Sequence, residues 1–141
     1  MAVFFKSVGV IGGTPKSSMV TTISAAAPQT RYMTLESPVG TAYQVTALKT
    51  FKAAIAQVYS SSSNSADSWQ LGYGDNAVAD GTTVPTTPQY VTAALGFNAA
   101  TGRWQSVDIY AECPAGKYPF IKTINTSTGM TNRVYILGIE E

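Results

Sequence analysis

The sequence predicts an all-β domain of the β-sandwich type, with about eight strands. Turn-forming residues recur along the whole chain, and the short segments between them are rich in Val, Ile, Thr, Tyr and Phe, a spacing typical of a sandwich or barrel. With 141 residues and 45% hydrophobic content, the chain is long enough to bury one substantial core. We therefore expect a single domain over residues 1–141.

Ten segments have the composition of strands, and turn residues separate them. In chain order they are residues 3–10, 19–24, 32–35, 42–46, 51–59, 69–73, 90–95, 104–112, 118–124 and 134–139. The turns between them fall at residues 12–15, 27–29, 37–40, 60–65, 72–74, 80–81, 101–102, 114–116 and 126–129.

The N-terminal segment Ala2-Val3-Phe4-Phe5 is too apolar to remain in solvent. It either pairs as a strand within this domain or docks onto a neighbouring chain by strand addition. We therefore treat residues 1–11 as a candidate exchanged or docking strand, with Val3, Phe4 and Phe5 as candidate interface residues.

Residues 51–59 allow two interpretations. Leu48, Phe51, Ile55 and Val58 fit helical spacing, and the alanines of this segment favour a helix. The β-favouring residues at both ends and the serine-rich stretch that follows favour a strand. We favour the strand and keep the helix as the alternative.

Two later segments show clear strand patterns. In residues 104–112 the even positions, from Trp104 to Tyr110, share one face, and the odd positions, from Gln105 to Ala111, form a second face that looks buried. Residues 134–139 are apolar throughout, which predicts a central strand. The stretch 74–88 holds two prolines and four threonines, and long irregular excursions of this kind are often functional, so it is a candidate contact surface.

Composition excludes several classes of chemistry. The chain has no histidine, which excludes Ser-His-Asp and Cys-His mechanisms, and its lone Cys113 cannot form an intrachain disulfide. Nine Lys and Arg against eight Asp and Glu leave a net charge of +1 with no basic run, so nucleic acid is a poor partner. We expect no cofactor and no enzymatic activity.

Carboxylates give only weak signals. Asp67, Asp75 and Asp80 form an oxygen-rich stretch, but the spacing matches no calcium loop, and turn formation at Asp75 is the better interpretation. Asp108 and Glu112 could form a glycosidase pair, but no rule selects them from the scattered acids. We expect no metal site and no catalytic residue.

Trp69 and Tyr73 flank the glycines of residues 72–74 and allow two interpretations. Such aromatic side chains either fill a β core or form a sugar-stacking platform of the kind found in β-sandwich lectins. The core is the better interpretation, since the glycines also allow another strand to approach closely.

Short motifs along the chain resemble those of small virion proteins of tailed bacteriophages, most closely the jelly-roll cement (decoration) proteins of the capsid. The motifs are Leu71-Gly72-Tyr73-Gly74-Asp75, then Pro85-Thr86-Thr87-Pro88, then Pro114-Ala115-Gly116-Lys117-Tyr118-Pro119-Phe120. The likeness covers roughly residues 40–139, in a chain with few charges and 13 serines and 18 threonines.

The resemblance implies a jelly-roll clamp that bridges major capsid subunits on the outer capsid surface and stabilises the lattice. The candidate interface also includes Trp69 and Tyr73, together with Asp75, Pro85 and Pro88 of the stretch 74–88. We expect the major capsid protein as partner, a homo-oligomer with a dimer favoured over a trimer, synthesis in the bacterial host cytoplasm, and no membrane or direct nucleic-acid contact. The alternative is a carbohydrate- or receptor-binding β-sandwich, such as a phage fibre head, with a glycan-cleaving enzyme last.

Overall fold

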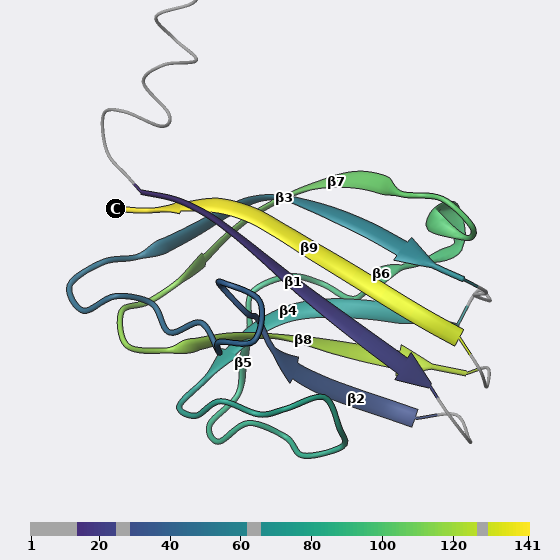
Figure 1. The fold of residues 1–141 in the computed structure, drawn as a ribbon, viewed down its shortest axis with the longest axis horizontal. Helices are drawn as coiled ribbons and strands as arrows, with labels where there is room; N and C mark the ends of the chain where they lie inside the picture. Colours follow the sequence, from purple (N-terminus) through teal and green to yellow (C-terminus); the bar gives the residue numbers. More distant parts are fainter. Residues whose placement is uncertain (1–13, 25–28, 62–65, 127–129) are drawn as a thin grey trace, which may run out of the picture.

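A computed structural model describes residues 14–24, 29–61, 66–126 and 130–141, and it confirms the all-β prediction. Two antiparallel sheets pack face to face as a β-sandwich (Figure 1). The β9 sheet has the order β1 (Thr14–Ser24), β9 (Met130–Glu140), β3 (Phe51–Ser60) and β7 (Gln105–Cys113). The β8 sheet has the order β2 (Gln29–Thr34), β8 (Tyr118–Asn125), β4 (Ser68–Gly74) and β5 (Gln89–Tyr90). The short strand β6 (Leu95–Gly96) also pairs with β4, and the 3-10 helix η1 (Asn98–Ala100) follows it.

The strand pairing is nested, as in a long hairpin rolled up on itself. β1 pairs with β9, β2 with β8, β3 with β7, and β4 with β5. Rolling this hairpin brings β9 beside β3 and β8 beside β4, which creates the two sheets. This is the arrangement of an eight-stranded jelly roll when β5 and β6 are taken as one interrupted strand.

Residues 51–60 form a strand, so the strand prediction is confirmed and the helical alternative is wrong. Ala53, Ala56 and Val58 are buried, and β3 is bonded on both sides, to β9 and to β7. The register of both pairings shifts between Ala53 and Ile55, which marks a β-bulge or similar irregularity. The helical pattern does not mark one face of the strand, since Leu48 lies outside β3 and is exposed, as is Ile55. Instead, the irregular position changes which residues face the core, so burial passes from Phe51 and Ala53 to Ala56 and Val58.

The core lies between the two sheets and contains large side chains from both. Its largest fully buried members are Trp69, Phe51, Phe97, Leu35, Leu71, Ile121 and Ile136. β9 lies between β1 and β3, which confirms residues 134–139 as a central strand. Over the described residues, no helix has the length and apolar character needed to cross a membrane.

Two predicted strands are wrong in detail. Residues 42–46 form no regular strand, although Tyr43 and Val45 are buried and their backbone N–H groups donate to the carbonyls of Leu35 (2.7 Å) and Lys117 (2.9 Å). Residues 90–95 contain an interruption between β5 and β6. There the Thr92 hydroxyl accepts a hydrogen bond from the backbone N–H of Leu71 at 3.0 Å, so a side chain takes the place of a ladder bond.

Residues 75–88 form an irregular stretch, as the sequence predicts. They cover part of the outer face of the β8 sheet and lie below it in Figure 1. Tyr32 and Gly81 exchange backbone hydrogen bonds of 2.7 and 3.1 Å, which tie the stretch to β2. On the same face Phe120 is fully buried, with its ring centroid 6.1 Å from that of Tyr32 and 5.7 Å from that of Tyr90. The two outer faces of the sandwich therefore differ, and this difference positions the candidate site.

Candidate functional site

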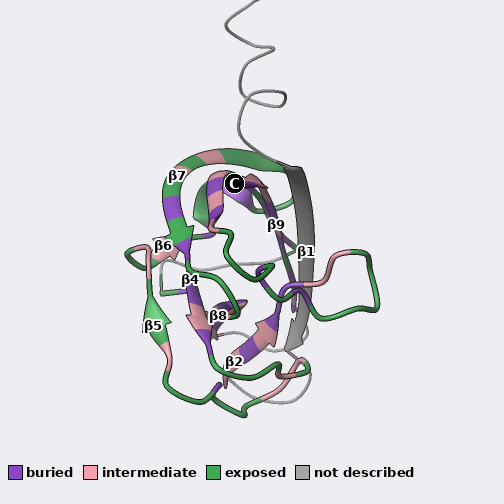
Figure 2. Ribbon diagram, turned by 90° about the vertical axis from the view of Figure 1, so that its left-hand side faces the viewer, coloured by how far each residue is buried: buried purple, intermediate pink, exposed green. Residues whose placement is uncertain are grey.

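Exposed aromatic and apolar side chains gather on the outer face of the β9 sheet, over β3, β7 and β9. Tyr59 on β3 lies opposite Arg133 on β9, next to the buried pair Val58 and Val134, so Tyr59 and Arg133 point outward. Trp104 directly precedes β7 and is 50% exposed. Figure 2 shows that most of β7 is exposed, in contrast to β4 and β8.

One end of this face holds a cluster that we call the aromatic patch, made of Tyr59, Trp104 and Arg133. The ring centroids of Tyr59 and Trp104 lie 5.7 Å apart with an interplanar angle of 36°. The Arg133 guanidinium carbon lies 5.8 Å from the Tyr59 centroid, within range of a cation–π contact. The patch thus offers apolar rings with one positive charge beside them.

The other end holds a pocket at the register shift, which we call the bulge pocket. It has a volume of about 420 Å³, and three consecutive residues from each of β3, β7 and β9 line it: 52–54, 110–112 and 137–139. Most of these side chains are apolar, with Lys52 and Glu112 as the exceptions. Gly138 is required here, because a Cβ at this position would lie 2.2 Å from the backbone oxygen of Lys52.

Tyr110 forms one wall of the bulge pocket in an unusual conformation. Its φ angle is 47°, a left-handed value that is rare for an aromatic residue, and its side chain is 81% exposed. Such strained positions persist where the surrounding structure holds them, and they are frequent at binding sites.

Charges on the described part of this face are balanced in sign, with Lys52 and Arg133 against Asp108 and Glu112. Lys52 pairs with the carboxylate of Glu141, which raises the pKa of the lysine. Glu112 also lies at the rim of the bulge pocket, so the rim carries Lys52 against Glu112 and Glu141. The surface therefore suits an apolar partner better than a highly charged one.

The structure contradicts the assignment of Trp69 to an interface, and with it the sugar platform of Trp69 and Tyr73. The alternation of β4 directs residues 69, 71 and 73 inward, so Trp69 is fully buried and Tyr73 packs partly buried against the core. The core interpretation of Trp69 is confirmed.

The remaining predicted interface residues lie elsewhere. Asp75 is exposed, and the Lys117 ammonium donates to it at 2.5 Å, which together with Thr87 lowers the pKa of the carboxyl. Pro85 is buried against Gly74, and Pro88 is partly buried. Val3, Phe4 and Phe5 lie outside the described residues. None of Asp75, Pro85 and Pro88 lines the bulge pocket or belongs to the aromatic patch.

The three carboxylates considered for calcium each bind a separate partner. Asp67 accepts hydrogen bonds from the backbone and hydroxyl of Thr126, Asp75 pairs with Lys117, and Asp80 pairs with Arg31 at 2.8 Å. Within the described ranges, no three His, Cys, Asp or Glu side chains come together as a metal site.

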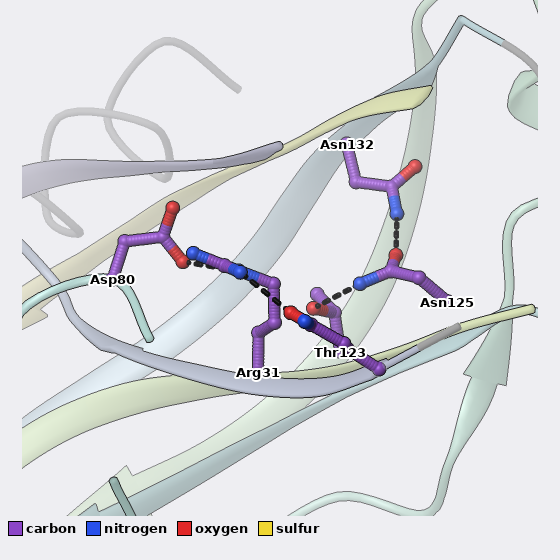
Figure 3. Close-up of polar contacts among 6 residues, drawn as sticks. Arg31, Asp80, Thr123, Asn125 and Asn132 are labelled. Carbon is purple, nitrogen blue, oxygen red and sulfur yellow. Dashed lines mark hydrogen bonds and ion pairs between the residues drawn. The ribbon is translucent and has the colours of Figure 1, made fainter. Parts of the chain in front are cut away.

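Polar side chains also enter the interior of the sandwich (Figure 3). The Asn132 side chain of β9 donates to Asn125 of β8, and Asn125 donates to the Thr123 hydroxyl at 3.2 Å. All three are buried. This chain of hydrogen bonds links β8 and β9, and therefore the two sheets. Because none of the three residues lines the bulge pocket, we assign the chain of bonds a structural role.

Sequence reasoning missed the aromatic patch as a site. It placed Trp104 and Tyr110 on one face of their strand, which is confirmed by their exposure. It could not place Tyr59 beside Trp104, because that contact depends on the register of β3 against β7. The sequence did offer one signal for this site: the predicted strand 104–112 carries two large aromatic side chains on its polar face.

No protein-family model matches the sequence, and no curated protein and no solved structure is found to be similar to it.

Proposed function

We propose that this chain is a structural virion protein, a capsid decoration protein that binds the outside of the major capsid lattice and stabilises it. The proposal rests on one observation: the outer faces of the two sheets differ in how far they are covered. The β8 sheet is partly covered by residues 75–88, whereas the β9 sheet presents Trp104 and Tyr110 to solvent (Figure 1).

The physics of such a protein agrees with this surface. Exposed aromatic side chains are typical anchors of protein interfaces, since they bury a large area with little loss of conformational entropy. A partner that repeats across a lattice lets moderate contacts add up through avidity when the protein is a homo-oligomer, for which we favour a dimer.

The fold supports the proposal by analogy only. Jelly rolls occur in viral capsid proteins, in lectins and in cupins, so the fold narrows the choice without deciding it. The sequence resemblance to tailed-phage decoration proteins selects the capsid among these, with the major capsid protein as partner and the outer virion surface as location.

Co-sedimentation with phage heads tests the proposal. Purified protein is mixed with intact heads and with heads stripped of decoration proteins, and the bound copies per head are counted. We expect saturable binding to stripped heads at a fixed ratio to capsid subunits, and a large loss of occupancy for Trp104→Ala. The matched control is Thr83→Ala, an exposed residue in the stretch over the other sheet. Absence of saturable binding overturns the proposal, and equal loss for both variants overturns the assigned surface.

A carbohydrate-binding module is the second candidate, and the aromatic patch favours it. Sugars stack on exposed aromatic rings, and the Arg133 guanidinium could donate hydrogen bonds to hydroxyl groups beside Tyr59. A glycan array with the wild type and Trp104→Ala decides this point. Glycan binding that depends on Trp104, without binding to heads, would replace the capsid proposal with this one.

A further inference from the structure

We infer that the bulge pocket is the docking site for the N-terminal segment of the same chain, residues 2–6. The segment would seat Phe4 and Phe5 between β3, β7 and β9 on the outer face of the β9 sheet. This inference does not depend on the proposed function, since it concerns a contact within one chain.

The place where β1 begins puts the segment within reach. Thr14 lies opposite Glu140, and Lys16 lies opposite Gly138, which is itself part of the pocket. β3, at the centre of the pocket, is two strands from β1, a distance of about 10 Å at the usual strand spacing. Phe5 precedes Thr14 by nine residues, a length that can span about 30 Å when extended.

The chain between the N-terminal segment and β1 can also reverse its direction just before β1. Gly12 and Gly13 directly precede β1. Glycine adopts left-handed and extended conformations without a Cβ penalty, so the chain can turn back over the sheet at this point.

The chemistry of the segment matches that of the pocket. The lining includes Ala54, Tyr110, Leu137 and Ile139, and the segment supplies one valine and two phenylalanines. A volume of about 420 Å³ lies in the range of pockets that hold small ligands, which is sufficient for an aromatic side chain. Burial of these rings would remove apolar surface of both partners from water.

The charges are complementary as well. Lys6 is the only charged side chain among residues 2–13, and it follows Phe5 directly. The rim of the pocket carries Glu112 and the pair of Lys52 with Glu141, so its formal charges sum to one negative. A lysine next to the docked rings would therefore meet an excess of negative charge.

Disulfide trapping in the full chain tests the inference. The variant Phe5→Cys with Ala54→Cys places one thiol on the segment and one in the pocket. The control, Phe5→Cys with Gln57→Cys, uses an exposed residue of the same strand outside the pocket. Native Cys113 is retained, because it is buried and its raised pKa keeps the thiol protonated. Mild oxidation is followed on non-reducing gels and by peptide mass spectrometry.

We expect an intramolecular crosslink between positions 5 and 54 that forms about tenfold faster than the one between positions 5 and 57, since docking raises the local concentration above that of a free tether. Equal rates at the two positions would overturn the inference. So would a covalent dimer, which indicates a second copy in the pocket. A third variant, Phe5→Cys with Val20→Cys, reports a hairpin on the edge of β1 that faces away from β9, and a faster crosslink there also overturns the inference.

Limited proteolysis provides a second measurement without cysteines. The variant Ala54→Phe fills the pocket from β3 and should displace the segment, whereas Gln57→Phe adds the same ring outside it. We expect chymotrypsin to cleave after Phe4 and Phe5 about tenfold faster in Ala54→Phe than in the wild type or Gln57→Phe, because cleavage follows the population of the open form. Equal cleavage in all three proteins would contradict the docking.

Discussion

At the scale of single residues, Tyr110 shows how strain and exposure coincide. Its φ of 47° costs about 1–2 kcal/mol for a residue with a Cβ, and its ring gains little from burial at 81% exposure. The conformation therefore opposes stability, which is consistent with a role of the side chain at the pocket.

The first prediction compares two substitutions at this position. Both Tyr110→Gly and Tyr110→Ala remove the ring, but only glycine relieves the left-handed conformation, so the glycine variant should be more stable by about 1 kcal/mol. Urea unfolding measures the difference. At Asp108, on the same strand without a positive φ, the order should reverse, because glycine is the weaker strand residue. If the alanine variant is the more stable one at both positions, the strain argument is contradicted.

Cys113 leads to the second prediction, on pH. Burial raises the pKa of its thiol from 9.0 to about 12. The stability that this protonated thiol contributes is fully present below the unfolded-state pKa and is lost as pH rises toward the folded-state value. We expect the wild type to lose about 1 kcal/mol more than Cys113→Ala between pH 7 and 9.5.

The same burial predicts low reactivity of this thiol. At pH 8 a pKa three units higher lowers the thiolate fraction by about a thousandfold, and access is blocked as well. Iodoacetamide should label Cys113 only after unfolding. Rapid labelling of the native protein would show that the core opens around β7.

At the scale of elements, the approach of β3 to β9 depends on one glycine. A Cβ on Gly138 would lie 2.2 Å from the Lys52 oxygen and 2.9 Å from the Ala53 Cα, both backbone atoms that cannot move away alone. The third prediction is that Gly138→Ala destabilises the protein by about 1–3 kcal/mol, measured by denaturant unfolding. Gly96→Ala is the control, since its nearest neighbour would be 3.9 Å away and the loss should be small.

The edge strand β7 illustrates a second feature of the elements. Its exposed face carries Asp108 and Glu112, and its register with β3 is interrupted near Tyr110. Charges and bulges on an edge strand oppose pairing with another chain. We therefore expect partners to contact the outer face of the β9 sheet rather than add a strand to β7.

The sequence predicted those elements whose pattern is local. The alternation of 104–112 and the apolar run of 134–139 each report burial through their own residues, and both agree with β7 and β9. Residues 42–46 have strand composition, but their backbone makes isolated hydrogen bonds to Leu35 and Lys117 instead of pairing along a neighbouring strand. Composition does not indicate whether a neighbouring strand is available for pairing. The same limit applies to the site. Trp69 and Trp104 both stand at the start of segments with strand composition. The side chain of Trp69 points into the core, however, whereas that of Trp104 is half exposed.

At the scale of the whole molecule, the low charge sets the expected response to salt. Charged residues make up 12% of the chain, and those on the described part of the β9 sheet face balance in sign. The fourth prediction is that head occupancy changes less than about twofold between about 0.05 and 0.5 M salt, because screening acts on charge pairs and not on apolar contact. Occupancy that collapses with salt in the co-sedimentation assay would point to an electrostatic interface.

The position of β9 also bears on how the chain is made. The strand that completes the middle of its sheet, between β1 and β3, follows both of them in the chain. Until β9 is made, β1 and β3 lack the neighbour that separates them, and unpaired strand edges are prone to aggregation. A chain that lacks β9 therefore cannot close its sandwich. A stop codon directly before β9 should yield insoluble protein, not a smaller working domain.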